Sequence, residues 1–256
     1  MDLPTTTSRI KTIFKEKRMR SIFVGIEYVG KTTLINLLDI YYRQRGRRTH
    51  LDDHFTIPDS SLSPDSRAEY ISYPNDVKER MQRMQIHYHV EVIRNYPHTL
   101  ISGWHIEEAV YCEVYGKEPR SPYYPNYIYH NQRHYEVMVL EARLPDVVLI
   151  HLTADDEVIK ERMLKAPHEY QIIREKDISD IKKRFEDEVD RSLLTRNGHL
   201  VTLDTTNKSP KESLDELLIK TEPLVTDGEM AMRAISVPKN DFKVYYEDGI
   251  RNTKED

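Results

Sequence analysis

Eight residues near the start of the chain have the types and the spacing to bind phosphate. Residues 25–32 read GIEYVGKT and fit the pattern G-x-x-x-x-G-K-[ST]. In this pattern backbone N–H groups surround the β-phosphate of a nucleotide, Lys31 reaches the β- and γ-phosphate oxygens, and the hydroxyl of Thr32 is available to Mg²⁺. The motif predicts a site for a nucleotide and Mg²⁺, with these nucleotide ligands: Gly25, Tyr28, Val29, Gly30, Lys31, Thr32 and Thr33.

The flanking sequence fits the structure that this motif requires. Ser21–Val24 is a short apolar segment, typical of a buried parallel strand. Residues 33–42 carry apolar side chains at positions 34, 37, 38 and 41, which share one face of a helix. This order of strand, loop and helix favours a phosphate-binding loop over the alternative, a glycine turn that caps an ordinary helix.

Two aspartates follow the next predicted strand, residues 49–51. Phosphoryl transfer to a hydroxyl needs a carboxylate near the attacking oxygen. Side chains alternate along a strand, so Asp52 and Asp53 point in opposite directions and take different roles. We expect Asp53 to be the general base and Asp52 to hold Mg²⁺ through water or to be structural. The alternative is a solvated acidic turn.

Strands and helices alternate along the chain, which is typical of a parallel sheet covered on both faces by helices. Ligands of such sheets bind at the carboxyl ends of the strands, where both motifs lie. The expected strands are 21–24, 49–51, 99–102, 146–152 and 199–204, and the expected helices are 33–42, 76–95, 128–143, 155–165, 177–195 and 209–220. The segments expected to be loops are 56–75 and 116–127.

The chain divides into three predicted parts. Residues 1–20 are a basic leader, residues 21–221 form the α/β domain, and residues 222–256 are a C-terminal extension without clear periodicity. Within the domain, the helix predicted at 76–95 carries one apolar stripe, made of Val77, Met81, Met84 and Tyr88.

Bulk composition limits the classes of function. The 256 residues are 38% hydrophobic and 32% charged, and the sequence contains no apolar run of about 18 residues that would span a membrane. Cys112 is the only cysteine, and the N-terminus has no apolar segment typical of a secretory signal. These features predict a cytoplasmic protein. The net charge of −5 makes a nucleic-acid partner possible but less favoured than a small molecule.

Several segments resemble the thymidylate kinase and deoxynucleoside kinase group of P-loop kinases. Residues 104–111, WHIEEAVY, are similar to the D-R-W-H-x-x-E-x-V-Y stretch of its phage and bacterial thymidylate-kinase-like branch. Residues 145–162 resemble its fourth strand and the helix leading to its lid, and residues 204–209 resemble its final strand and adenine-side loop. The resemblance implies a three-layer sandwich with a five-stranded parallel sheet in the order 2-3-1-4-5, plus a lid at about 163–177.

The same resemblance implies roles for residues outside the glycine loop. Arg162 and one of Arg174 or Lys176 become lid cations that close over the phosphates, and we take Arg162 and Arg174 as the candidates. The alternative is an ordinary solvated loop. Asn207 is placed beside the adenine. The group also implies a homodimer packed through helices.

The chain departs from this group at the end of the third strand. Ser102-Gly103 stand where the group has Asp-Arg, the residues that help to position Mg²⁺ and hold phosphate. Residues 52–55, DDHF, resemble instead the D-D-F-Y stretch of uridine kinases, where the aspartate is implied to be the base for a free hydroxyl. Together these features favour an alcohol as the phosphoryl acceptor over a nucleotide phosphate.

The helix predicted to follow the third strand carries further substrate candidates. His105, Glu108 and Tyr111 recur three residues apart and share one helical face, and Trp104 offers a ring that can stack on a base. The alternatives are capping and packing of that helix, with Trp104 in the core.

The leading hypothesis is a kinase that uses ATP and Mg²⁺ to phosphorylate a hydroxyl of a nucleoside-like small molecule. Three alternatives remain. The chain is a nucleoside monophosphate kinase in which Arg120 or Arg133 replaces the missing arginine, a kinase acting on a polynucleotide hydroxyl, or a nucleotide-binding regulatory protein.

Overall fold

The structure is a computed structural model of the chain, and it describes most of the predicted α/β domain. The described residues are 19–53, 62–118, 121, 123, 130–168, 172–196 and 198–225, without the side chains of 130–134. The predicted leader up to residue 18, most of the segment 116–127, Arg120, the side chain of Arg133 and the extension from residue 226 onward lie outside the described residues.

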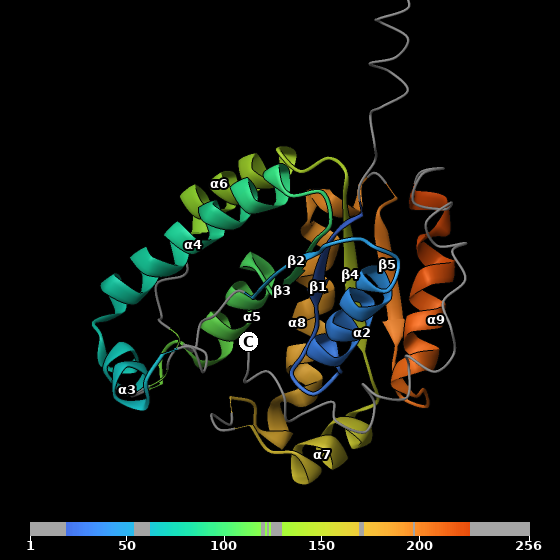
Figure 1. The fold of residues 1–256 in the computed structure, drawn as a ribbon. Coiled ribbons are helices and arrows are strands. Elements are labelled where there is room, and N and C mark those ends of the chain that lie inside the picture. Colours follow the sequence, from blue (N-terminus) through green and yellow to red (C-terminus); the bar gives the residue numbers. More distant parts are fainter. Residues whose placement is uncertain are drawn as a thin grey trace, which may run out of the picture.

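Five parallel strands form the centre of the molecule (Figure 1). Their order is β2-β3-β1-β4-β5, so the predicted fold class and strand order are confirmed. The strands are β1 (Arg20–Val24), β2 (His50–Asp53), β3 (Thr99–Ser102), β4 (Val147–Thr153) and β5 (Leu200–Asp204).

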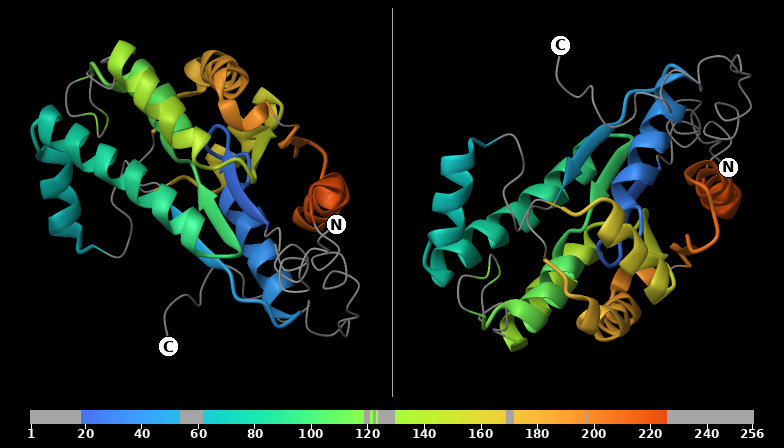
Figure 2. Two further views of the ribbon diagram at one scale, coloured as in Figure 1. Left: turned by 90° about the horizontal axis from the view of Figure 1, so that it is seen from above. Right: turned by 90° about the horizontal axis from the view of Figure 1, so that it is seen from below.

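Helices cover both faces of the sheet, which makes a three-layer sandwich (Figure 2). One face carries α2 (Lys31–Arg43) and α9 (Pro210–Thr221). The other face carries α4 (Asn75–Asn95), α5 (His105–Tyr115), α6 (His130–Ala142) and α8 (Ile178–Arg191). The remaining elements are α3 (Pro64–Ser72), α7 (Asp156–Lys165) and the short 3-10 turns η2 (Glu175–Asp177), η3 (Leu193–Thr195) and η4 (Glu222–Leu224).

The central strands are apolar because helices cover both of their faces. Ile22 of β1 pairs with Ile101 of β3 on one side and with Leu149 of β4 on the other, and all three side chains are fully buried. Burial of this kind stabilises a parallel sheet and fixes its register. The register in turn brings the carboxyl ends of β1, β2 and β3 together at one edge.

One expectation about local structure requires correction, and one predicted stripe proves to lie on the surface. Residues 64–72 of the expected loop 56–75 form helix α3, because Ser63 caps its N-terminus by accepting the N–H of Ser66 and Pro64 occupies its first turn. In α4 the predicted stripe is exposed: its member Met84 is 67% exposed, whereas Ile86, Val90 and Ile93 face the core.

Gly25 is required where β1 runs into the glycine loop. Its φ angle is +147°, and a Cβ placed there would lie 2.3 Å from the carbonyl oxygen of Leu152 in β4. The loop therefore passes so close to the neighbouring strand that no side chain fits between them. The close approach ties the shape of the glycine loop directly to the sheet.

Replacement of Gly25 by alanine is expected to lower the free energy of unfolding by about 3 kcal/mol or more, because backbone atoms must move to admit the methyl group. Gly46 is the matched control: its φ is +73°, but its Cβ would meet nothing within 4 Å. Gly46→Ala should cost only about 1 kcal/mol of conformational strain. Urea unfolding of both variants measures the difference, and equal losses would contradict the close-approach argument.

Candidate active site

The glycine loop places backbone N–H groups and one lysine at the start of α2. Gly30 has φ +93° and open space where a Cβ would be, so the backbone there is accessible to a ligand. Tyr28 also has a positive φ, +68°, which is uncommon for a side chain of this size. The Lys31 ammonium folds back and donates a hydrogen bond of 2.7 Å to the carbonyl of Gly25. These features are compatible with the phosphate-binding role that the motif predicts for the loop.

A cavity of about 370 Å³ opens over this loop. Its walls come from the glycine loop with the start of α2, from α7 and the residues after it, and from the segment that follows β5. Apart from Gly25, every predicted nucleotide ligand of the glycine loop lines it. The other lining residues are Glu27, Leu34, Arg162, Ala166, His168, Thr205, Lys208, Pro210 and Ser213. Asn207 is exposed and is not among them.

Two glutamates that the sequence analysis did not single out lie beside the lysine. The ammonium of Lys31 is 3.0 Å from Oε1 of Glu107 and 3.7 Å from Oε1 of Glu27. Burial alone would lower the pKa of Lys31, but these carboxylates raise it above its ordinary value. Burial also raises the pKa of Glu107, against the opposing effect of Lys31. The pair of Lys31 and Glu27 could have been found from the sequence, because the two residues are four positions apart. The pair of Lys31 and Glu107 could not, because only the fold brings these residues together.

Asp53 faces the same group of charges from the end of β2. It is paired in register with Ser102 of β3, and the Ser102 side chain hydrogen-bonds to its carboxylate. Burial raises the pKa of Asp53 to about 6, although the charge of Lys31 acts to lower it. A carboxylate that titrates near neutral pH suits the role of a general base.

Asp52 points to the opposite side of the strand, as alternation requires. Its Oδ1 accepts the backbone N–H of Asp53, and its Oδ2 lies 3.5 Å from Nε2 of His89 and 3.9 Å from Nε2 of His50. These contacts are with α4 and β2 and not with the glycine loop. The structure favours a structural role for Asp52 over a role in binding Mg²⁺ or the substrate.

The candidates at the start of α5 are mostly structural. The Trp104 indole is fully buried and donates to the carbonyl of Ile86, so it is not available to stack on a base. His105 lies 2.8 Å from the buried carboxylate of Glu141, and the carboxylate of Glu108 accepts the thiol of Cys112. The helical face shared by His105 and Glu108 therefore turns toward the protein interior. Their assignments to substrate are corrected to packing and capping.

Tyr111 supports the glycine loop from below. Its ring is 1% exposed, and its hydroxyl accepts the backbone N–H of Glu27 at 3.0 Å. The hydroxyl thereby holds the loop backbone at Glu27, the residue directly before Tyr28. In this position Tyr111 acts on the phosphate-binding loop and does not face an acceptor.

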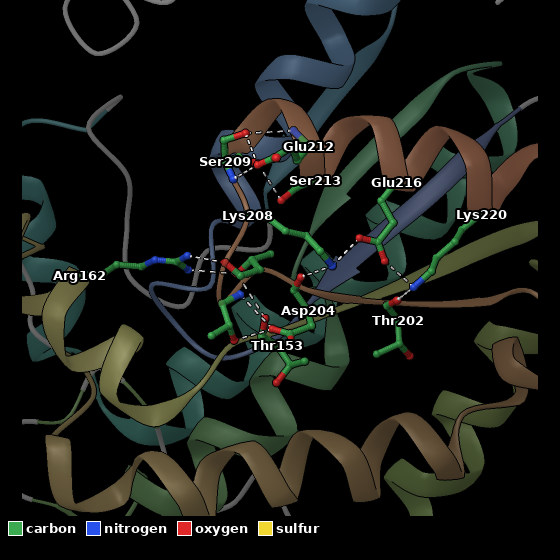
Figure 3. Close-up of polar contacts among 12 residues, drawn as sticks. Thr153, Arg162, Thr202, Asp204, Lys208, Ser209, Glu212, Ser213, Glu216 and Lys220 are labelled. Carbon is green, nitrogen blue, oxygen red and sulfur yellow. Dashed lines mark hydrogen bonds and ion pairs between the residues drawn. The ribbon is translucent and has the colours of Figure 1, made fainter.

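Arg162 spans the cavity from α7 to the segment after β5. Its guanidinium donates to the carbonyl of Tyr28 at 3.0 Å and to the carbonyl of Thr205 at 2.8 Å. Figure 3 shows it pointing from α7 toward this segment, where Lys208 pairs with Glu216 at 2.5 Å. Of the two proposed lid cations, Arg162 is at the cavity.

Arg174, the other proposed lid cation, lies elsewhere. Its guanidinium pairs with Asp177 at 2.6 Å and with Glu118 at 2.7 Å, and it lies over the ring of Tyr115. It does not line the cavity over the glycine loop. The structure does not bring Arg174 to the nucleotide site.

The oxygen donors at the site fit a magnesium ion shared with a nucleotide. Mg²⁺ prefers oxygen ligands and keeps several waters, so one or two protein oxygens suffice. The Thr32 side chain is exposed and lines the cavity. The Glu107 carboxylate is not part of the lining and lies 3.0 Å from the Lys31 ammonium. Within the described part of the chain, no three His, Cys, Asp or Glu side chains gather into a metal-binding group. The donors suit a nucleotide-bound ion better than a protein cage.

Comparison with known proteins shows the fold. No family model and no curated protein matches the chain by sequence. The structure is similar to that of thymidylate kinase from Candida albicans, with a TM-score of 0.54 and 15% identity over 80% of this chain and 92% of that one. It is also similar to deoxyadenosine kinase from M. mycoides with bound dATP, with a TM-score of 0.55 and 16% identity over 79% and 98%.

A second structure of the M. mycoides enzyme, with dCMP and dCDP bound, gives a TM-score of 0.51 and 14% identity over 80% of this chain and 100% of that one. At these identities the likeness shows that this chain shares its fold with these enzymes, and no more than the fold. None of the helices in the described residues has the length and apolar character needed to cross a membrane.

Stability should depend on pH through Asp53. Its folded pKa of about 6 lies above the ordinary value of 3.8, so the folded chain binds the proton more tightly and loses stability as pH rises through this window. Asp53→Asn removes the penalty and should raise the free energy of unfolding by about 1–3 kcal/mol at pH 7. The gain should vanish below pH 4. Urea titrations at several pH values test this, and a gain that is equal at every pH would contradict it.

Proposed function

We propose that the protein is a kinase that uses ATP and Mg²⁺ to phosphorylate a hydroxyl group of a nucleoside-like small molecule. The observation that carries the proposal is the convergence of the Asp53 carboxylate, at the end of β2, and the Lys31 ammonium, directly after the loop that follows β1, beside a cavity over the glycine loop. The two enzymes with similar folds are nucleoside and nucleotide kinases, which supports the same general chemistry here.

The residues divide the reaction between them. Backbone N–H groups from the glycine loop and the Lys31 ammonium hold the β- and γ-phosphates. Asp53 takes the proton of the acceptor hydroxyl while the oxygen of that hydroxyl bonds to the γ-phosphorus. The bond from the γ-phosphorus to the β–γ bridging oxygen breaks and releases ADP. Bound Mg²⁺ would neutralise charge on the two phosphates. The hydroxyl of Thr32 is the protein group nearest that role.

Arg162 is suited to hold the nucleotide and not to transfer a proton. Its guanidinium already joins the glycine loop to the segment after β5, through Tyr28 and Thr205. It closes the cavity wall on the side where Lys208 and Pro210 also lie. A bound nucleotide would therefore touch residues that follow β1, β4 and β5.

A nucleoside monophosphate is the second candidate acceptor, because one similar structure is a thymidylate kinase. A phosphate acceptor needs a cation near the end of β3, and the described residues there are Ser102 and Gly103. Arg120 and the Arg133 side chain lie outside the described residues. The hydroxyl acceptor remains the better supported, since Asp53 supplies a base that a phosphate acceptor does not need.

We also propose a homodimer formed through the stripe on α4. Its apolar residues Val77, Met81, Met84 and Tyr88 are spaced four, three and four apart, the spacing of a seam between packed helices, and each is at least 40% exposed. Helix α6 lies beside α4 (Figure 1), and its Tyr135 is 71% exposed. A second copy is favoured because the same stripe on two antiparallel helices is self-complementary.

The cellular location proposed is the cytoplasm. The single cysteine, Cys112, is buried, and its thiol donates to the carboxylate of Glu108. A chain with one buried thiol has no internal disulfide to maintain, which is compatible with a reducing compartment.

Asp53→Asn should reduce kcat by about 10²–10⁴-fold and leave ATP affinity nearly unchanged, because the amide cannot accept the hydroxyl proton. The measurement is transfer of label from γ-labelled ATP over a panel of nucleosides, nucleoside monophosphates and short oligonucleotides. The wild-type kcat/KM should also fall as pH drops below about 6, in line with the pKa of Asp53. Lys31→Ala is the companion variant and should weaken both binding and turnover.

The class of acceptor that receives the label decides between the hypotheses. Label on a nucleoside hydroxyl supports the proposal, and label only on monophosphates replaces it with the second candidate. Transfer only to oligonucleotides, with steep salt dependence, indicates a polynucleotide kinase. ATP binding with no transfer to any acceptor contradicts the enzymatic proposal and leaves a nucleotide-binding regulator.

Met84→Lys should convert the dimer to a monomer, because it places a charge in the middle of the proposed seam. Light scattering coupled to gel filtration measures the mass of each variant. Ile219→Lys on α9, where the side chain is 69% exposed, is the matched control and should leave the dimer intact. A wild-type protein that is monomeric at high concentration would exclude this interface.

A further inference from the structure

The carboxylate of Glu107 packs against the backbone of residue 103, which is glycine. A Cβ at Gly103 would lie 2.9 Å from Oε2 of Glu107 and 3.1 Å from its Cδ. Gly103 has φ +82° and the next residue, Trp104, has φ +70°, so the chain turns sharply before α5 begins. This turn sets Glu107 in the first turn of α5, and its side chain, 11% exposed, reaches back to Lys31.

The lysine is outnumbered by the carboxylates that act on it. Glu107, Glu27 and Asp53 all raise its pKa, so one cation faces three acidic groups. A nucleotide triphosphate brings several further negative charges to the same place. Without additional positive charge, the carboxylates compete with the phosphates for Lys31 and repel them in a partly desolvated site. The charges in direct contact with Lys31 therefore work against a metal-free nucleotide, although Arg162 and Lys208 line other walls of the cavity.

We propose that Glu107 makes this site selective for the metal complex of a nucleotide over the metal-free nucleotide. The inference rests on the proposed nucleotide site and adds the form of nucleotide that the site accepts. Without a divalent cation, the Glu107 carboxylate holds Lys31 and opposes the phosphates. With the cation, the same carboxylate is a hard oxygen donor beside the phosphates, and its interaction with the complex becomes attractive.

Glu107 fits this role better than the other two carboxylates. Its oxygen is the nearest to Lys31, at 3.0 Å against 3.7 Å for Glu27, and Glu27 is the more exposed of the pair. Asp53, at the end of β2, is hydrogen-bonded to Ser102, at the end of β3. Of the three, Glu107 is the one that packs against the glycine backbone of the turn before α5.

The test measures affinity and not turnover. Calorimetry gives the Kd of the β,γ-imido analogue of ATP, which cannot donate its terminal phosphate, in Mg²⁺ and in EDTA. In the wild type the analogue should bind much more tightly with Mg²⁺. Glu107→Gln should tighten binding in EDTA and weaken it in Mg²⁺, so that the ratio of the two affinities falls by about tenfold or more.

Two further variants keep the result interpretable if Glu107→Gln unfolds. Glu107→Asp retains the charge and should retain most of the ratio, whereas Gly103→Ala displaces the carboxylate and should lower the ratio without removing the charge. Glu113→Gln is the matched control, because it removes a charge from the same helix at a surface pair with Arg184. It should leave the ratio unchanged.

The outcomes separate this inference from the proposed function. If the wild type fails to bind the analogue in either buffer, the nucleotide site itself is wrong. If the wild type binds with a clear Mg²⁺ preference and folded Glu107→Gln keeps that preference, the role of Glu107 is overturned and the nucleotide site stands. Equal loss of affinity in both buffers would assign Glu107 to support of the loop, and would also overturn the inference.

Discussion

The burial of the Lys31 ammonium is the constraint on which the rest of the site depends. The side chain is only 7% exposed, and removing a charge from water is costly unless hydrogen bonds and counter-ions compensate. The carbonyl of Gly25 and the carboxylate of Glu107 provide that compensation. Both partners depend on glycines, because Gly25 lets the loop pass against β4 and Gly103 leaves room for the glutamate. A side chain at either glycine would disturb the position of the lysine.

The sheet turns these local contacts into a site. Parallel strands that share a register end at one edge, so the loop after β1, Asp53 of β2 and the turn after β3 meet although they are far apart in the sequence. The pairing of Asp53 with Ser102 sets the height of the carboxylate, and alternation along β2 turns Asp52 toward His89. One strand therefore delivers one residue to the site and the next residue to the packing of α4.

Sequence patterns predicted the parts of the structure that depend on near neighbours. The glycine loop, the five strands and the position of Asp53 follow from local composition and period, and the strand order came from family resemblance. Helical spacing showed that His105 and Glu108 share a face, but it cannot say which face turns inward, and both proved to be internal. Glu107 was missed because its partner Lys31 lies 76 residues away in the sequence. The pairing of β1 with β3 and the turn at Gly103 bring the two side chains together.

The departure at Ser102-Gly103 is then part of a different arrangement of charge. The Cβ of an arginine at position 103 would lie 2.9 Å from the Glu107 carboxylate, so that carboxylate would have to move, whereas glycine leaves it beside Lys31. The result is a lysine with carboxylates around it, while the other cations of the cavity, Arg162 and Lys208, line its other walls. The carboxylates around Lys31 favour a polyphosphate that brings positive charge with it. The contact of Glu107 with Lys31 and the proposed selectivity for a metal-bound nucleotide would therefore both follow from the turn between β3 and α5.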